Sequence, residues 1–266
     1  MVTLLIDADI VAYKFSAASE RKYNWGDGII SVAQDENYDP FKKAVDYIEE
    51  IKEKLGATDT IICLSDPSDN FRKHVLDTYK ANRKGVPKPV HLMAVKDHLA
   101  NTYPSFIRPT LEADDIMGIL STHPTLVKGK KVIVSSDKDL QQIVGYLYNP
   151  DKDKDVRLIT PSSALRFHMY QTLVGDTADN YKGCPRIGEV KANRILDAAE
   201  QHYNTTHPTQ RASMEKTYWL AIVDTYEDAG LDEVDALVQA QVSRMCTHSD
   251  YDFKNRKVIL WQVPLV

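Results

Sequence analysis

The sequence predicts an α/β fold, in which a mostly parallel β-sheet is flanked by helices and is followed by a mostly helical portion. Three short apolar runs, at residues 2–6, 60–64 and 131–135, are typical of buried strands. Helical patterns separate them, and this alternation favours a parallel sheet because parallel strands are commonly joined through a helix. With 266 residues, the chain is long enough for one large domain with a smaller appendage.

Helical spacing of apolar residues defines the elements between these strands. Residues 41–55 carry apolar side chains on one helical face and charges on the other. Residues 21–39 contain the turn-prone sequence Trp25-Gly26-Asp27-Gly28 and predict a hairpin or loop. The other elements expected in this part are helices at 10–18, 92–99, near 112–120 and at 140–144, with strands at 105–108 and 156–160.

Beyond residue 161 the pattern is mostly helical. We expect helices at 162–174, 189–199, 214–229 and 232–245, followed by an edge strand at 257–261. The predicted organisation is therefore an α/β core at residues 1–165 and a helical portion at residues 166–266.

Net charge is a weak guide to the partner of this chain. The 33 Lys and Arg residues face 38 Asp and Glu residues, which gives −5 and by itself argues against nucleic acid. If the nine acids singled out below bind metal, 29 acids remain and the rest of the chain carries a net charge of +4. Such a surface need not repel a phosphodiester.

The start of the chain and its cysteines bear on location. The strand-like run at 2–6 differs from a signal peptide, and no apolar stretch approaches the roughly 20 residues that cross a bilayer. Cys63, Cys184 and Cys246 are far apart and form no C-x-x-C pattern. These features predict a cytoplasmic protein with reduced thiols and no membrane contact.

Acidic residues follow each of the three predicted strands. Asp7, Asp66, and Asp137 with Asp139 stand just beyond the strand ends. Because parallel strands end at one edge of a sheet, these carboxylates are expected to lie close together. A single such acid could simply cap the next helix, which is how we interpret Asp9. Chance is a poor account of the whole set.

An acidic stretch with Glu112, Asp114 and Asp115 precedes an apolar helical run. Taken alone, it is more simply a helix start, because acids are favoured in a first turn. Together with the strand-end acids, and with Asp176 and Asp179 further on, it predicts a cluster of carboxylates. Such a cluster is repulsive unless cations neutralise it. Oxygen ligands suit Mg²⁺ or Mn²⁺, and two such ions about 3.5–4 Å apart can hydrolyse a phosphodiester.

The segment at residues 70–89 is strongly basic. Phe71 and Tyr79 are interleaved with six basic residues, while Asp77 is its one acid. Such a segment can follow a phosphate backbone and stack on a base; the alternative is a solvated helix and loop. The basic residues are Arg72, Lys73, Lys80, Arg83, Lys84 and Lys88.

A glycine-rich turn at residues 183–188 joins two predicted helices. Gly183 and Gly188 could expose backbone N–H groups to a phosphate, with Arg186 and Lys191 nearby. A helix–turn–helix used only for packing is an equally good interpretation.

These motifs together make the chain resemble the flap endonuclease/5′→3′ exonuclease family, most of all the stand-alone exonucleases of short-tailed lytic bacteriophages. Seven short motifs run in the family's order from residue 5 to about residue 195. They are Leu5-Ile6-Asp7, Ser65-Asp66, Phe71-Arg72, Tyr79-Lys80-Ala81-Asn82-Arg83, Leu111-Glu112-Ala113-Asp114-Asp115, Ser135-Ser136-Asp137-Lys138-Asp139, and Val174-Gly175-Asp176-Thr177-Ala178-Asp179-Asn180 with residues 183–188.

The resemblance implies a PIN-like α/β core and a helix-two-turn-helix element that grips duplex DNA, with K⁺ at its turn. Residues 70–89 would form an arch or clamp, in which Lys80 and Arg83 act catalytically on the scissile phosphate and Tyr79 stacks on the terminal base. Two Mg²⁺ ions would be held by Asp7, Asp66, Glu112, Asp114, Asp115 and Asp137, with Asp139, Asp176 and Asp179 completing the second site. Further DNA contacts would come from Arg72, Lys84, Gly183, Arg186, Gly188 and Lys191.

The predicted function is a Mg²⁺-dependent 5′→3′ DNA exonuclease with 5′-flap endonuclease ability that leaves 5′-phosphates. By resemblance it would also remove RNA from RNA–DNA hybrids during phage-type replication and recombination, as a monomer in the host cytoplasm. The alternatives are a non-catalytic protein that binds DNA junctions or ends, and a phosphoryl-transfer enzyme acting on small substrates. A phosphoryl-transfer enzyme acting on small substrates would not explain the basic segment.

Overall fold

The computed structural model describes residues 1–24, 26, 30–207 and 212–263, which group into two compact units. Unit 1 comprises residues 1–69, 86–140 and 145–158, and unit 2 comprises 70–85, 141–144 and 159–266. Residues 70–85 of the basic segment, which was expected to belong with the α/β core, thus group with the C-terminal helices, whereas residues 86–89 belong to unit 1. The predicted functional division after residue 165 stays a prediction.

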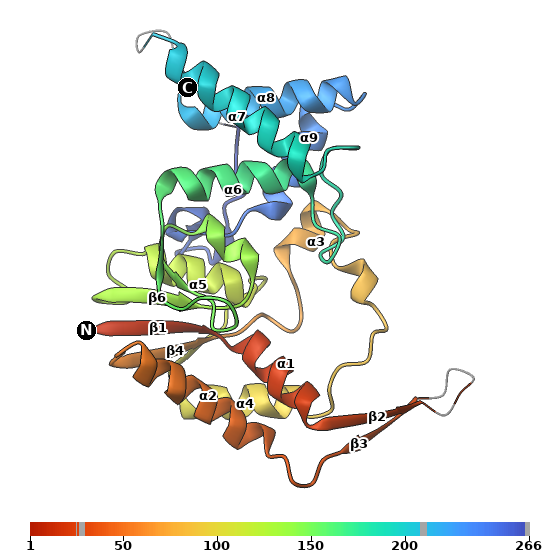
Figure 1. The fold of residues 1–266 in the computed structure, drawn as a ribbon, viewed down its shortest axis with the longest axis vertical. Helices are drawn as coiled ribbons and strands as arrows, with labels where there is room; N and C mark the ends of the chain where they lie inside the picture. The colour runs from red at the N-terminus through yellow and green to blue at the C-terminus, as the bar shows by residue number, and fades with distance from the viewer. Residues whose placement is uncertain (25, 27–29, 208–211, 264–266) are drawn as a thin grey trace. The chain divides into compact units, whose positions relative to one another are not determined.

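Unit 1 is built on a six-stranded sheet with the order β5-β4-β1-β6-β7-β8 (Figure 1). The central strand β1 pairs in parallel with β4 and β6, while β5 and β7 extend the sheet in parallel on either side. The predicted α/β class with a mostly parallel sheet is therefore confirmed. The strands are β1 (Val2–Asp7), β4 (Asp59–Cys63), β5 (Ser105–Phe106), β6 (Lys130–Val134), β7 (Gly145–Tyr148) and β8 (Arg157–Ile159).

Helices cover both faces of this sheet. Side chains alternate along β1, so Leu4 and Ile6 face one way and pack in a core with Ile48 and Leu99, while Leu5 faces the other way. Helices α1, α2 and α4 lie on the first face and α5 lies on the opposite one (Figure 1). Their bounds are α1 (Ala8–Ala18), α2 (Pro40–Lys54), α4 (Leu92–Thr102) and α5 (Ala113–Thr122).

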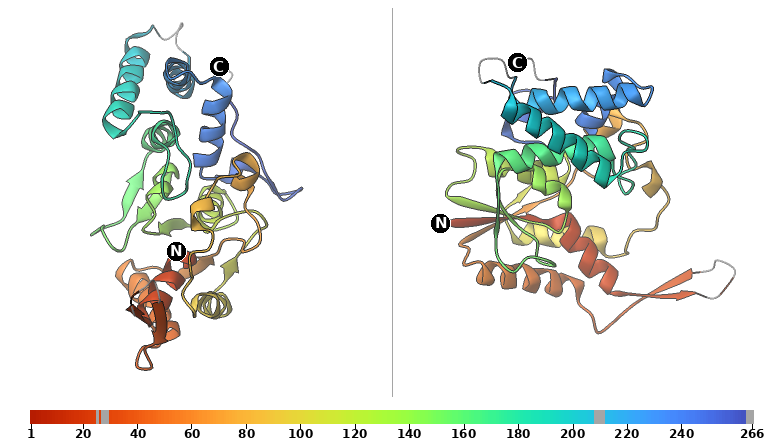
Figure 2. Two further views of the ribbon diagram at one scale, coloured as in Figure 1. Left: turned by 90° about the vertical axis from the view of Figure 1, so that its right-hand side faces the viewer. Right: turned by 45° about the horizontal axis from the view of Figure 1, so that its top comes forward.

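A two-stranded antiparallel ribbon follows α1. It consists of β2 (Glu20–Asn24) and β3 (Ile30–Gln34), and it projects beyond the end of the helix (Figure 2). The hairpin expected within residues 21–39 is confirmed. Of its expected turn, residues 25, 27 and 28 lie outside the described residues.

Unit 2 is mainly helical. Its core is built around Trp219 and Tyr226, and the Tyr226 hydroxyl donates to the Thr172 carbonyl at 2.7 Å. The helices are α3 (Phe71–Val75), α6 (Pro161–Val174), α7 (Glu189–Thr205), α8 (Met214–Asp228) and α9 (Glu233–Ser243), with a 3₁₀ turn η1 (Ala81–Arg83). A small ribbon of β9 (Tyr251–Asp252) and β10 (Lys257–Val258) lies near the end of the chain, with another 3₁₀ turn, η3 (His248–Asp250), before it.

Three details differ from the sequence-based expectations. The strand expected at 257–261 is limited to β10 and pairs with β9, so it forms no edge of the main sheet. A 3₁₀ turn, η2 (Lys138–Gln142), replaces the helix expected at 140–144, and the unpredicted strand β7 follows it. With four residues, β7 is too short to show a period in the sequence. In the described part of the chain, no helix is both long and apolar enough to pass through a membrane.

Candidate active site

Asp7 lies at the centre of the acidic edge of unit 1. It ends β1 and caps α1, because its Oδ1 accepts a hydrogen bond from Ile10 N at 3.1 Å. Its Oδ2 accepts from Ser135 Oγ at 2.7 Å, and Ser135 Oγ in turn accepts from Asp137 N at 3.0 Å. Ser135 therefore links the two acid-bearing strand ends, as expected from the parallel pairing of β1 with β6.

Asp66 belongs to the neighbouring strand end, beyond β4. Hydrogen bonds lower its pKa, first from the Ser68 hydroxyl at 2.6 Å and then from Thr110 N at 2.8 Å and Ser68 N. The backbone N–H of Asp66 donates to the Leu111 carbonyl. These bonds hold Asp66 beside the segment that leads into α5.

Glu112 and Asp115 begin α5 as a capping box. Asp115 is fully buried, and its Oδ2 accepts a hydrogen bond from Glu112 N at 3.1 Å. The simpler interpretation of this stretch, a helix start, is therefore confirmed, with Asp114 in the first helical turn. A capping role and a metal-binding role are compatible only for oxygens that the cap leaves available.

Asp137 and Asp139 occupy the loop after β6. Asp137 Oδ1 accepts from Asp139 N at 2.8 Å, and Lys138 Nζ lies 2.9 Å from Asp139 Oδ1. Asp139 is buried whereas Lys138 is exposed. The exposed ammonium provides a counter-charge to this carboxylate.

Asp9 was missed as a member of the acidic group. The cap of α1 is Asp7, so the interpretation of Asp9 as the cap is wrong. Asp9 Oδ1 lies 2.8 Å from Lys96 Nζ, and Oδ2 accepts from Ser65 N at 3.2 Å. The spacing Asp7-Ala8-Asp9 was the signal, because the second acid falls in the first helical turn beside the first.

The electrostatics of Asp7 indicate that this edge is suited to a cation. The pKa of Asp7 is raised to about 7, first by burial and then by the charges of Asp9 and Asp137, while the hydrogen bonds from Ser135 and Ile10 oppose the shift. A divalent cation among these oxygens would relieve that repulsion.

Among the described residues, no three carboxylate, His or Cys side chains already converge as metal ligands. The carboxylates instead accept hydrogen bonds from local N–H and O–H groups, as described above for Asp7, Asp66 and Asp115. The donor set is nevertheless all oxygen, which fits Mg²⁺ or Mn²⁺.

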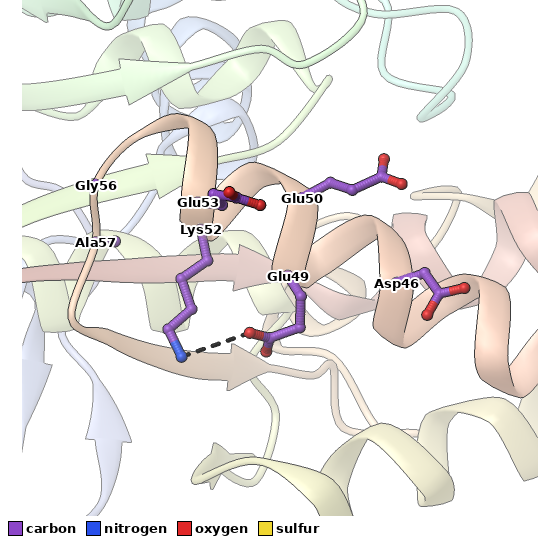
Figure 3. Close-up of a pocket in the computed structure, with 7 residues that line it drawn as sticks. All are labelled: Asp46, Glu49, Glu50, Lys52, Glu53, Gly56 and Ala57. Carbon is purple, nitrogen blue, oxygen red and sulfur yellow. Dashed lines mark ion pairs between the residues drawn. The ribbon is translucent and has the colours of Figure 1, made fainter.

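A second acidic surface in unit 1 has a different character. A hollow of about 500 Å³ near the end of α2 is lined by Asp46, Glu49, Glu50 and Glu53, with Lys52 paired to Glu49 at 3.6 Å (Figure 3). It contains none of the predicted ligands. Its charge opposes the approach of a phosphate backbone.

In unit 2, Asp179 gathers the predicted catalytic residues of the basic segment. Its carboxylate receives Tyr79 Oη at 3.0 Å, Lys80 Nζ at 3.4 Å and Arg83 Nη2 at 2.5 Å. The Lys80 N–H also donates to the Asp179 carbonyl at 2.8 Å. Predicted cations and a predicted metal ligand are therefore paired with one another, and the other expected acid, Asp176, caps the same loop through Ala178 N.

Two predicted DNA contacts are buried. Arg72 is fully buried, and its guanidinium donates to the Val242 carbonyl at 2.9 Å and the Arg244 carbonyl at 2.6 Å. Tyr79 is 2% exposed and packs with Tyr181 and Val242. This differs from their predicted roles in DNA binding, because groups in the interior of unit 2 contact both side chains. Lys84 is exposed.

The glycine turn exposes only some of the backbone N–H groups that were expected to bind a phosphate. Gly183 has φ 62°, and a Cβ there would lie 2.4 Å from Gly175 N, so only glycine fits. Its N–H donates to Gln239 Oε1 at 2.9 Å and is not available to a phosphate. Gly188, the N-cap residue of α7, is exposed. Arg186 and Lys191 are exposed as well.

Comparison with known proteins identifies the class. Residues 2–166 match the family described as 5′-3′ exonuclease, N-terminal resolvase-like domain. The chain belongs to this family. It is an enzyme of the 5′→3′ exonuclease/flap endonuclease class.

Named relatives are similar along the chain to different extents. The exonuclease of Escherichia phage T7 is 28% identical and the alignment covers 97% of this chain and 93% of the relative. The flap endonuclease Xni of Shewanella halifaxensis is 29% identical over 48% of this chain and 54% of its own length. A bacteriophage T5 flap endonuclease, solved as a product complex with DNA and metal ions, shares the fold with a TM-score of 0.54 at 16% identity, covering 90% of this chain and 93% of that one.

Proposed function

We propose that this enzyme hydrolyses DNA phosphodiesters from 5′ ends and at 5′ flaps in a Mg²⁺-dependent reaction that leaves 5′-phosphates. The observation that carries the proposal is the position of Asp7. It is buried at the shared end of parallel strands, and its pKa is raised to about 7 by burial and by neighbouring carboxylates. Such a site gains most from a divalent cation.

The acids of unit 1 are the proposed principal ligands. Two Mg²⁺, or Mn²⁺ in their place, would supply an activated water and stabilise the leaving oxygen. The unit 1 set is Asp7, Asp66, Glu112, Asp114, Asp115, Asp137 and Asp139. That Asp176 and Asp179 of unit 2 complete the second site remains part of the proposal.

The basic segment is proposed to act on the scissile phosphate. Lys80 and Arg83 would stabilise the negative charge that develops on its oxygens. In doing so they would exchange their present partner, the Asp179 carboxylate, for the substrate. The buried Arg72 and Tyr79 are better suited to holding this segment in unit 2 than to contacting DNA, so stacking of Tyr79 on a base would require its side chain to leave the interior.

DNA binding is proposed to use the exposed groups of unit 2. These are Lys84, Gly188, Arg186 and Lys191, with K⁺ at the glycine turn as a further proposal. The T5 flap endonuclease was solved with DNA and metal ions, which supports a DNA substrate and a bound metal here. We extend the proposal to RNA–DNA hybrids, to phage-type replication and recombination, and to a monomer that acts in the host cytoplasm.

Substrate preference tests the proposal. The purified chain is incubated with 5′-labelled duplex, 5′-flap and RNA–DNA hybrid substrates, with Mg²⁺ or with EDTA. We expect short 5′ products from all three with Mg²⁺ and none with EDTA. Cleavage that continues in EDTA would exclude the metal-dependent mechanism, and an intact hybrid would limit the substrate to DNA.

A further inference from the structure

A hydrogen-bonded path crosses the acidic edge of unit 1. Asp9 Oδ2 accepts from Ser65 N at 3.2 Å, and Ser65 Oγ accepts from Ala113 N at 3.0 Å. These residues belong to three separate elements, namely the first turn of α1, the segment after β4 and the start of α5. The path therefore fixes three chain segments relative to one another through two hydrogen bonds.

Each residue on this path is next or nearly next to proposed metal ligands. Asp9 follows Asp7 by two residues, and Ser65 directly precedes Asp66. Ala113 stands between Glu112 and Asp114. The spacing of four proposed ligands thus depends on groups that are not ligands themselves.

The Asp9 carboxylate is itself held in place. Lys96 Nζ of α4 lies 2.8 Å from Oδ1, and the Asp9 and Lys96 side chains are 24% and 20% exposed. Oδ1 is therefore paired with the ammonium by charge, without hydrogen-bond geometry, and Oδ2 accepts a hydrogen bond from a backbone N–H. This arrangement suits a structural anchor better than a metal ligand, whose oxygens must face the ion.

We propose that Asp9 and Ser65 are positioning residues for the metal site, with Lys96 as the anchor of the Asp9 carboxylate. They act by setting the separation of the segments that carry Asp7, Asp66 and the start of α5. This inference rests on the proposed metal-dependent function. Asp9, Ser65 and Lys96 would support the ligands from behind. Loss of one of these three side chains would weaken metal binding without removing a ligand.

Three variants distinguish an effect of these hydrogen bonds on metal binding from an effect of the negative charge of Asp9. Ser65→Ala removes the acceptor of Ala113 N without changing any charge. Asp9→Asn and Asp9→Ala remove the same charge, but only Asn retains an oxygen that can accept from Ser65 N. Mn²⁺ binding is measured directly by electron paramagnetic resonance, and Mg²⁺ dependence is measured from cleavage of a 5′-labelled duplex.

The positioning role predicts a specific ranking. Ser65→Ala and Asp9→Ala should each raise the Mn²⁺ dissociation constant on the order of tenfold, and Asp9→Asn should raise it less than Asp9→Ala. Cleavage should recover toward the wild-type rate at saturating Mg²⁺. Duplex affinity measured in EDTA should be unchanged.

A matched control uses Asp46→Asn on α2, which breaks the Lys42–Asp46 ion pair of 2.6 Å in the same unit. It should bind Mn²⁺ like the wild type. Equal losses in Asp9→Asn and Asp9→Ala, with a normal Ser65→Ala, would overturn the inference and make Asp9 a ligand or a source of charge only. A wild type that neither binds Mn²⁺ nor cleaves would instead remove the proposed function.

Discussion

The hydroxyl of Tyr79 donates a hydrogen bond to Oδ2 of Asp179 at 3.0 Å, across 100 residues of sequence. The same carboxylate pairs with Lys80 and Arg83. One acid therefore fixes the part of the basic segment that was predicted to act on the substrate.

Replacing Asp179 with Asn should loosen the basic segment. Asn lacks the charge that holds Lys80 and Arg83, and loss of these bonds should cost roughly 1 kcal/mol because the groups are partly exposed. Trypsin, which cuts after Lys and Arg, should cleave within residues 80–88 several times faster than in the wild type. Asp197→Asn, which breaks an exposed ion pair with Arg166 in the same unit, is the control. An unchanged cleavage rate in Asp179→Asn would show that other contacts hold the segment.

Lys80→Ala should lower the chemical rate much more than it weakens DNA binding. If the ammonium stabilises developing charge, its loss should cost on the order of 10²-fold in the single-turnover rate. Binding of a 5′-flap duplex in the absence of metal should change far less. The comparison is Lys84→Ala, an exposed lysine of the same segment. Equal losses of rate and affinity in Lys80→Ala would reduce Lys80 to a phosphate anchor.

Asp114→Ala and Asp137→Ala should each abolish turnover while duplex binding survives. The proposed ligands supply the charge that holds the metal ions, whereas DNA binding is assigned to the basic groups of unit 2. A cleavage assay measures the loss of turnover, and fluorescence anisotropy on the same duplex measures the retained binding. Wild-type rates in either variant would remove that acid from the metal site.

Stability without metal should depend on pH through Asp7. Its pKa is raised from 3.8 to about 7, so the folded protein keeps a proton that the unfolded chain loses between about pH 4 and 7. The contribution to stability is present below pH 4 and is lost as pH rises through 7. Above pH 7 in EDTA, Asp7→Asn should therefore raise the free energy of unfolding by about 2–4 kcal/mol.

Urea unfolding at pH 4.5 and pH 8 checks this pH dependence. The gain from Asp7→Asn should be large at pH 8 and small at pH 4.5, and Mg²⁺ should stabilise the wild type more than the variant. Asp46→Asn should show no such pattern. A gain that is the same at both pH values would mean that the Asp7 carboxyl is already ionised at pH 4.5.

The sequence was sufficient for the three central strands of the sheet, β4, β1 and β6, and for the acids that follow them. Residues 2–6, 60–64 and 131–135 are apolar runs, so these strands and the acids that follow them are visible without a structure. Asp7 and Asp137 then come together through Ser135 because parallel pairing places their strand ends side by side.

Interactions between distant residues could not be predicted in the same way. Arg72 looks like a DNA contact in a basic run, but its carbonyl partner on Val242 is 170 residues away. Asp9 looks like a cap until Lys96 and Ser65 are seen beside it. Composition identifies charges, whereas only the fold reveals which charges are already paired.

The most direct measurement of the central claim is a time course on 5′-labelled duplex and 5′-flap DNA, with Mg²⁺ and with EDTA, using the wild type beside Asp114→Ala. The account predicts Mg²⁺-dependent release of mononucleotides or short 5′ fragments by the wild type alone, with equal DNA binding by both proteins. Intact DNA in the presence of Mg²⁺, or equal cleavage by both proteins, would contradict it.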